Sequence, residues 1–252
     1  MFIDTHCHIN SQELRLDASG IITRARSAGV AKMVIIGCDF EDSCEAAGLA
    51  HDFGLYASVG IHPHEAKRYE KIPEEFNTLV QHERVVAVGE IGLDYHYDHS
   101  PRDIQKKIFD LQLRFAREKK MPVVLHIRDA MNEAMPILRN YFDLKLLFHC
   151  YSGGLKFLDE VLELKGMCAF GGALTWKGKA FDELREVFKK VPAENILLET
   201  DSPYMTPVPF RGKLNEPAYI KYIYEAAAEI RNIKLGELEE IIADNAKRFF
   251  NF

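Results

Sequence analysis

The sequence lacks the features that mark membrane, secreted and disulfide-rich proteins. No apolar run approaches the roughly 20 residues that a membrane span needs. The N-terminus has no basic segment followed by an apolar run, so we expect no secretory signal. No Cys-x-x-Cys pair occurs, and an odd number of scattered cysteines indicates reduced thiols in a cytoplasmic protein. These cysteines are Cys7, Cys38, Cys44, Cys150 and Cys168.

Positive charge is also scarce. Lys and Arg number 32 against 38 Asp and Glu, so the formal net charge is -6. This balance argues against a protein that holds nucleic acid through bulk positive charge, although a local patch or bound cations could still do so. The 252 residues suffice for one large domain or two small ones. Because no linker or low-complexity segment marks a boundary, we expect a single domain over residues 1–252, by default a monomer with no obligatory protein partner.

The chain does contain strand and helix patterns that alternate from end to end. Short apolar runs are typical of parallel strands that are buried on both faces. Helical periodicity fills most gaps between these runs, as at Ile104, Ile108, Leu111 and Phe115, which would share one helix face. The eight predicted strands are Phe2–Ile9, Lys32–Ile36, Leu55–Ile61, Val85–Ile91, Val123–Ile127, Leu144–Phe148, Met167–Phe170 and Ile196–Glu199.

Eight strands that alternate with helices predict an α/β fold, a (β/α)8 TIM-type barrel. A last apolar stripe, from Leu238 to Phe249, predicts an extra C-terminal helix. The competing architecture is an open doubly wound sheet, but no Gly-x-Gly-x-x-Gly follows the first strand. Ser100 and Pro101 predict the start of the fourth helix, with the serine as N-cap and the proline at the first helical position.

The first predicted strand carries two histidines in a His-x-His pattern. Successive side chains of a strand point to opposite faces, so His6 and His8 should point the same way and Cys7 the other way. Two imidazoles side by side at a strand end make half of a metal site. Alone the pattern is a weak signal, because two ordinary polar residues would look the same.

Further imidazoles and carboxylates follow the later strands directly. In a barrel of this type the strand ends converge on the active site. A polar side chain there would cost several kcal/mol if buried without a partner, and metal ligation removes that cost. Four imidazoles and two carboxylates suffice for two divalent ions, such as Zn, Mn, Ni or Fe, or also Mg. The predicted ligands are His6, His8, Glu90, His126, His149 and Asp201.

The two carboxylates among these ligands have a predicted catalytic role. Many hydrolases with His-x-His on the first strand bridge two metals through a modified lysine, but no lysine lies between Lys71 and Lys106. Glu90 is therefore the available bridging carboxylate. Asp201, at the end of the last strand, suits a ligand that also accepts a proton from water. Glu199 lies on the same strand face one layer deeper, where we expect a supporting hydrogen-bonding group.

The remaining candidates concern the substrate. For His62 a supporting role, a substrate contact and loop packing all remain open, whereas His64 is expected to be a helix cap or a surface residue. Arginine and lysine side chains near the barrel mouth are candidates for binding phosphate. The N–H groups of a Ser-Gly-Gly turn that opens a helix could also bind phosphate. Aromatic rings near the mouth are candidates for stacking on an unpaired base. Plain solvation or loop packing is the alternative for each. The residues are Arg128, Arg211, Lys213, Ser152–Gly154, Trp176 and Tyr95.

The ordered set of motifs resembles the TatD family of metal-dependent deoxyribonucleases, within the wider metallo-hydrolase barrels. The resemblance implies that the six ligands form a two-metal centre bridged by Glu90. It also implies hydrolysis of DNA phosphodiesters, in some members as a 3′-to-5′ exonuclease. We therefore expect single-stranded or end-frayed DNA as the substrate. The matching segments are Phe2–His8, Gly60–His64, Gly89–Tyr95, His126–Ala130, His149–Gly153 and Glu199–Tyr204.

Two other functions fit parts of the pattern. A barrel amidohydrolase would use the same metal pair on a small amide, lactone or phosphoester, although the missing bridging lysine disfavours its usual form. A non-catalytic metal-binding protein would need the ligands but no base, and Asp201 in the base position argues against it. Activity on phosphodiesters but not on amides or lactones separates these possibilities.

Overall fold

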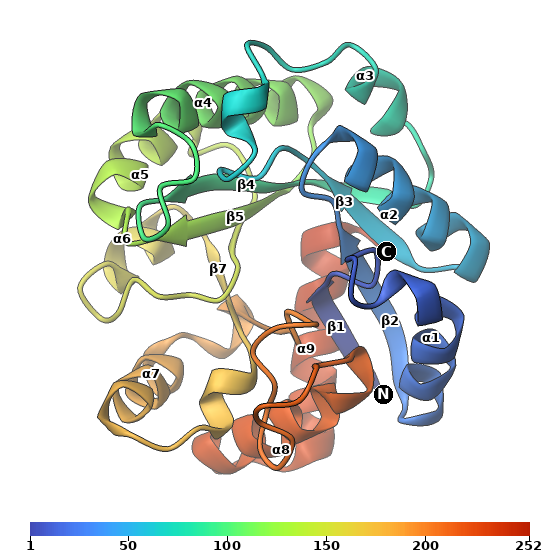
Figure 1. Cartoon of the computed structure of the whole chain (residues 1–252). Coiled ribbons are helices and arrows are strands. Elements are labelled where there is room, and N and C mark those ends of the chain that lie inside the picture. The colour runs from blue at the N-terminus through green and yellow to red at the C-terminus, as the bar shows by residue number, and fades with distance from the viewer.

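The computed structural model describes residues 1–252, and its centre is one sheet of eight parallel strands in the order β1 to β8. This is the predicted α/β barrel of the TIM type, with helices around the strands (Figure 1). The strands are β1 (Phe2–Cys7), β2 (Val30–Ile36), β3 (Tyr56–Val59), β4 (Val85–Asp94), β5 (Val123–Arg128), β6 (Leu146–Phe148), β7 (Met167–Phe170) and β8 (Ile196–Leu198).

The helices follow the strands in alternation, and the predicted extra helix closes the chain. The C-terminal helices α8 and α9 pack beside β1, so the two ends of the chain meet (Figure 1). No helix has the combined length and hydropathy to cross a membrane. The helices are α1 (Ala18–Ser27), α2 (Phe40–Phe53), α3 (Phe76–Leu79), α4 (Arg102–Lys119), α5 (Met131–Leu138), α6 (Leu158–Glu163), α7 (Lys179–Lys190), α8 (Ile220–Arg231) and α9 (Leu235–Phe250).

Burial follows the apolar patterns of the sequence. Met33, Val34 and Ile35 on β2 are fully buried, as expected for a strand between the barrel interior and the helix layer. On α4, Ile108 and Leu113 are buried on the face toward the strands. A continuous apolar core therefore supports the strand ends on which the polar residues sit.

The predicted start of α4 is wrong in detail. The helix begins at Arg102, Pro101 takes the N-cap position and no side chain caps it. Ser100 is fully buried and its hydroxyl donates instead to the carbonyl of His64 at 2.8 Å. The serine thus joins two loops above β3 and β4, a long-range use that local sequence signals do not reveal.

Backbone hydrogen bonds between the first and last strand regions close the barrel at the end that carries the site. The N–H of Asp201 donates to the carbonyl of His6 at 2.9 Å, and the N–H of His8 donates to Ser202 at 2.7 Å. Below them, the buried carboxylate of Asp4 accepts the hydroxyl of Thr200 at 2.6 Å. Closure therefore places the polar residues of strand 1 beside those that follow strand 8.

Strand ends differ modestly from the predicted ones. β1 stops at Cys7 rather than Ile9 because the backbone of His8 turns to pair with Ser202. β4 runs on to Asp94, which pairs with Arg128 of β5. The longer β4 carries Asp94 into the site described below.

Candidate metal centre

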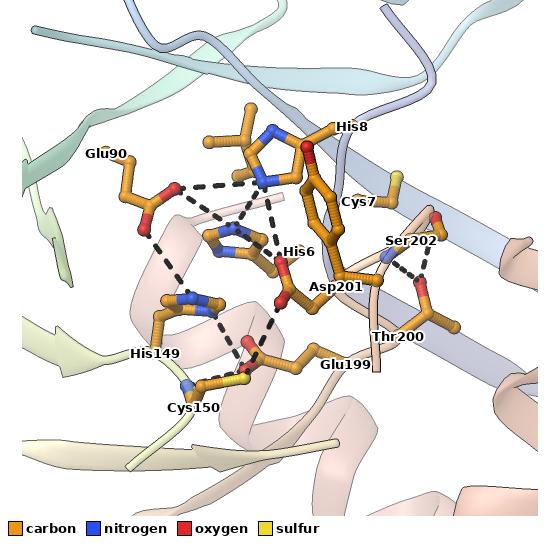
Figure 2. Close-up of polar contacts among 12 residues, drawn as sticks. His6, Cys7, His8, Glu90, His149, Cys150, Glu199, Thr200, Asp201 and Ser202 are labelled. Atoms are coloured by element: carbon orange, nitrogen blue, oxygen red, sulfur yellow. Dashed lines mark hydrogen bonds and ion pairs between the residues drawn. The ribbon is translucent and has the colours of Figure 1, made fainter. Parts of the chain in front are cut away.

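Four side chains from β1, β4 and the segment after β8 converge on one point. The Nε2 atoms of His6 and His8 lie 3.1 Å apart, so the two imidazoles do face the same way. Oε2 of Glu90 lies 3.4 Å from the first nitrogen and 3.7 Å from the second. Oδ1 of Asp201 lies 3.7 Å and 3.5 Å from the same two nitrogens. Figure 2 shows these four groups around a common centre.

These separations suit one metal ion. Four ligand atoms held tetrahedrally at about 2.1 Å from an ion lie about 3.4 Å from one another. The five measured nitrogen–nitrogen and nitrogen–oxygen distances, 3.1 to 3.7 Å, scatter around that value. Imidazole nitrogen and carboxylate oxygen are also the ligands that Zn and similar divalent ions take. The residues therefore fit a divalent ion both by spacing and by chemistry.

The other oxygen of Glu90 faces a second group of imidazoles. Oε1 lies 2.7 Å from Nδ1 of His126, 3.5 Å from Nε2 of His149 and 3.7 Å from Nε2 of His62. His62, Glu90 and His126 lie close enough together to share an ion. His62, which the sequence left undecided, thus stands among potential ligands.

The carboxyl groups of this site are buried, and their pKa values are set by the imidazoles around them. Glu90 is only 2% exposed. Burial alone would raise the pKa of its carboxyl, but the imidazoles of His149, His6 and His62 hold that pKa well below its ordinary value. Burial would likewise raise the pKa of Asp201, and His149 and His8 keep it below its usual range. Both groups are therefore carboxylates, the form that binds cations.

Glu199 has the supporting position expected of it. Oε1 lies 3.0 Å from Nδ1 of His149, and it accepts the N–H of Cys150 at 2.7 Å. This leaves Nε2 of His149 turned toward Glu90 (Figure 2). A carboxylate behind a histidine fixes the ring orientation and raises its basicity as a ligand.

Asp94 is a site residue that sequence reasoning missed. Its Oδ2 lies 3.0 Å from Nε2 of His126 and 2.9 Å from Nε2 of His64. Its Oδ1 accepts the N–H groups of His96 and Tyr97, both at 2.9 Å. Burial would raise the pKa of Asp94, yet these bonds, led by the one from His126, hold it well below its ordinary value. A usable signal existed, because Asp94 stands four residues after Glu90, a short distance beyond the predicted strand end at Ile91.

The expectation for His64 is wrong. It is neither a helix cap nor a surface residue: its side chain is 25% exposed and faces Asp94. Its position two residues after His62 repeats the spacing of His6 and His8, which is the signal that could have identified it. The loop above β3 therefore contributes two imidazoles to the site.

The convergent groups line a cavity of about 590 Å³ that opens at the barrel mouth. Arg128 is the one arginine among the lining residues. Its guanidinium lies over the ring of Tyr97, 4.8 Å from the ring centre, and forms no ion pair with a carboxylate of the chain. The lining includes His8, His62, His64, Glu90, Asp94, His126, His149 and Asp201.

Three predicted substrate contacts lie outside this lining. Arg211 stacks on Trp176 at 4.5 Å, and the indole N–H donates to the carbonyl of Thr206 at 2.8 Å. Lys213 lies 5.6 Å from the ring centre of Phe210. The structure thus brings Trp176 and Arg211 to each other, while their contact with substrate stays a prediction.

One further expectation about loops needs correction. The Ser152–Gly154 turn does not open a helix directly, because α6 begins at Leu158. For Tyr95 the structure shows the packing alternative, since the guanidinium of Arg102 lies over its ring at 4.3 Å. Stacking of its other face on a base stays a prediction.

Comparisons with known proteins bear on the fold and the family of the chain. The family described as TatD related DNase matches residues 3–251. A Bacillus subtilis protein named uncharacterized metal-dependent hydrolase YabD is 37% identical over 254 residues, which cover 99% of both chains. A Klebsiella pneumoniae protein named 3'-5' ssDNA/RNA exonuclease TatD is 32% identical over 98% of this chain and 97% of its own. The crystal structure of YJJV, a TatD homolog from Escherichia coli K12, covers 100% of this chain and 98% of its own with a TM-score of 0.90 and 29% identity.

Proposed function

The chain belongs to the TatD-related DNase family of metal-dependent hydrolases, and from that premise we propose that it hydrolyses phosphodiester bonds in DNA. The proposed substrate is single-stranded or end-frayed DNA, shortened from its 3′ end. The observation that carries the proposal is Glu90, whose two oxygens face two separate groups of potential ligands. Such a bridged pair of divalent ions suits phosphoryl transfer. The relative named as a 3'-5' exonuclease supports the choice of substrate.

Each group of ligands would hold one ion. His6, His8 and Asp201 would hold the first with Oε2 of Glu90, and His126 and His149 the second with Oε1, with His62 close by. When bound, two divalent ions lower the pKa of water and neutralise negative charge on the phosphate. The ions themselves would be Zn, Mn, Mg or Ni.

In this proposal Asp201 takes the proton of the attacking water. Its Oδ1 faces the imidazoles of His6 and His8, while Oδ2 lies 3.9 Å from the thiol of Cys150. Because its pKa is held below the usual range, this carboxylate is ionised at neutral pH and can accept a proton. A catalytic base in this position distinguishes an enzyme from a protein that only binds metal.

Arg128 is the candidate for holding the phosphate. The side chain lines the cavity and has an aromatic ring, not a carboxylate, as its partner. A guanidinium without a carboxylate partner keeps its donors available for two phosphate oxygens. The net charge of -6 makes such a local cation, together with the bound ions, the means of attracting DNA.

A panel of model substrates tests the proposal. Wild-type protein loaded with Mn should hydrolyse bis(p-nitrophenyl) phosphate and leave p-nitroanilides and lactones intact. Asp201→Asn should lower kcat by at least about 100-fold, as expected for loss of a general base. The exposed Asp244→Asn serves as the matched control and should match wild type. Turnover of an amide or lactone, with none of the phosphodiester, would replace the proposal by the amidohydrolase alternative.

We further propose that residues 1–252 act as one domain, as a monomer and in the cytoplasm. All proposed ligands come from one chain, so the site needs no partner subunit. The five cysteines are free thiols, which fits a reducing compartment.

A further inference from the structure

Tyr204 presents an aromatic ring at the mouth of the metal cavity. The side chain lines that cavity and the residue is 55% exposed. Few of the large aromatic residues of this chain are exposed, and these are Tyr97, Phe142 and Tyr204. The ring of Tyr204 lies 6.2 Å from that of His8, at an interplanar angle of 65°. It therefore stands beside the first group of ligands without packing flat against them.

The backbone of Tyr204 is fixed although its ring is exposed. Its N–H donates to the carbonyl of Asp201 at 2.8 Å. Its carbonyl accepts the side-chain amide of Asn215 at 2.6 Å, and the same buried amide also donates to the carbonyl of Thr200 at 2.9 Å. Because this backbone is already ordered, a ligand that packs on the ring does not have to order the loop that carries it.

Other rings near the cavity are already covered. The ring of Tyr97 lies parallel to His99, at 2° and 5.4 Å between centroids, and under the guanidinium of Arg128 at 4.8 Å. Tyr204 has a single aromatic neighbour, His8, which meets it edge to face, and no cation lies over it. Among the aromatic side chains that line the cavity, Tyr204 is thus the one with a free face.

We propose that Tyr204 stacks on an unpaired base of a nucleotide that flanks the scissile phosphodiester. This inference rests on the proposed function and names the feature of the substrate that the site reads. Any base offers a flat face to an aromatic ring, so stacking tolerates all sequences. A base inside an intact duplex has both faces covered and would first have to unstack. Tyr204 would therefore favour single-stranded ends over duplex.

Kinetics on base-free ends test this inference. Oligonucleotides that carry either normal bases or an abasic sugar at the last two 3′ positions would be compared. Wild type should show about a tenfold lower KM for the strand with bases. Tyr204→Leu should abolish that difference with kcat little changed, while Tyr204→Phe and Tyr204→Trp keep it. Phe142→Leu, an exposed aromatic outside the cavity lining, is the control and should behave as wild type.

A spectroscopic measurement reads stacking without turnover. An oligonucleotide with 2-aminopurine at its 3′ end would be bound to Asp201→Asn protein. Fluorescence should be quenched when the Asp201→Asn protein binds the oligonucleotide. A second substitution in the same chain, Tyr204→Leu, should remove the quenching, whereas Tyr204→Trp should retain it. If the wild-type protein cuts no strand but the quenching depends on Tyr204, the proposed reaction is wrong and the stacking site is still supported. If Tyr204→Leu changes neither the KM ratio nor the quenching, the inference is overturned.

Discussion

At the residue scale, Glu90 determines how the imidazoles around it are arranged. The carboxylate is buried and its two oxygens have different neighbours, His6 and His8 on one side and His126 and His149 on the other. Buried ionic groups are costly unless every lone pair has a partner. Cations placed between these ligands would supply those partners. Two metal ions would thus stabilise the fold and perform the chemistry with the same residues.

Substitution of Glu199 should weaken metal binding without removing a ligand. Glu199→Gln removes the charge that faces Nδ1 of His149, so the imidazole becomes a weaker ligand at Nε2. We expect about 10–100-fold lower metal affinity, the usual effect of losing such a supporting carboxylate. Titration with a metal-sensitive dye measures it directly. Glu186→Gln, an exposed residue of α7, is the control, and equal affinities in all three proteins would contradict the supporting role.

Prediction from the sequence was strong for residues at strand ends and weak for residues further into the loops. His6, His8, Glu90 and Asp201 come together as predicted, because parallel strands end at one rim. His64 was misplaced because a short loop carries no periodicity that reveals its direction. Asp94 was missed for a related reason, as its strand is longer than the apolar run that predicted it.

At the element scale, helix α4 holds two strand ends in place. The amide of Gln112 exchanges two hydrogen bonds with the backbone of Ile61, at 2.7 Å and 2.9 Å. Two turns earlier on the same helix face, Gln105 does the same for Asp94, at 2.8 Å and 3.1 Å. Both glutamines are buried. They fix the backbone next to His62 and at Asp94, the partner of His126, so α4 supports this part of the second group of ligands.

Replacement of Gln112 should therefore lower both the stability of the fold and the activity. Gln112→Leu leaves the buried N–H and carbonyl of Ile61 without partners, which should lower the free energy of unfolding by about 2–4 kcal/mol. Urea unfolding followed by circular dichroism measures this. Gln81→Leu is the control, because Gln81 is exposed and has no buried partner. This variant should leave the free energy of unfolding almost unchanged. A similar change in both variants would contradict the role assigned to α4.

Element order and type were predictable, whereas element ends were not. Alternating apolar runs identified all eight strands and the final helix, because burial on both faces leaves a clear pattern. The ends at Cys7, Asp94 and Arg102 depend on pairing with distant segments, such as the bond from His8 to Ser202. Local composition does not encode these contacts.

At the scale of the whole molecule, bound metal should raise thermal stability. Ions that bind the folded chain alone stabilise it by about 2.7 kcal/mol per site at a concentration 100 times Kd. For a chain of this size that corresponds to an increase in Tm of about 5–10 °C for each occupied site. Differential scanning calorimetry with Mn, and after EDTA treatment, measures the difference. Glu90→Gln should show a much smaller difference in Tm between the two conditions. A wild-type Tm that is the same with Mn and after EDTA treatment would contradict a metal centre in the barrel.

The charge of the whole molecule also bears on its substrate. A net charge of -6 gives no broad attraction to DNA, so the affinity for the proposed substrate would come from the cavity itself. Bound ions, Arg128 and the ring of Tyr204 would act on one or two nucleotides. An enzyme of this design would work at strand ends rather than along a duplex.

The most direct test of this account is a gel assay with end-labelled single-stranded DNA. Wild type and Asp201→Asn would each be loaded with Mn or Mg and incubated with strands labelled at the 5′ end. The account predicts a ladder of progressively shorter 5′-labelled products with wild type and loss of that ladder in Asp201→Asn. An intact strand in every lane would contradict the DNase assignment, and a ladder that persists in Asp201→Asn would contradict the role of this carboxylate.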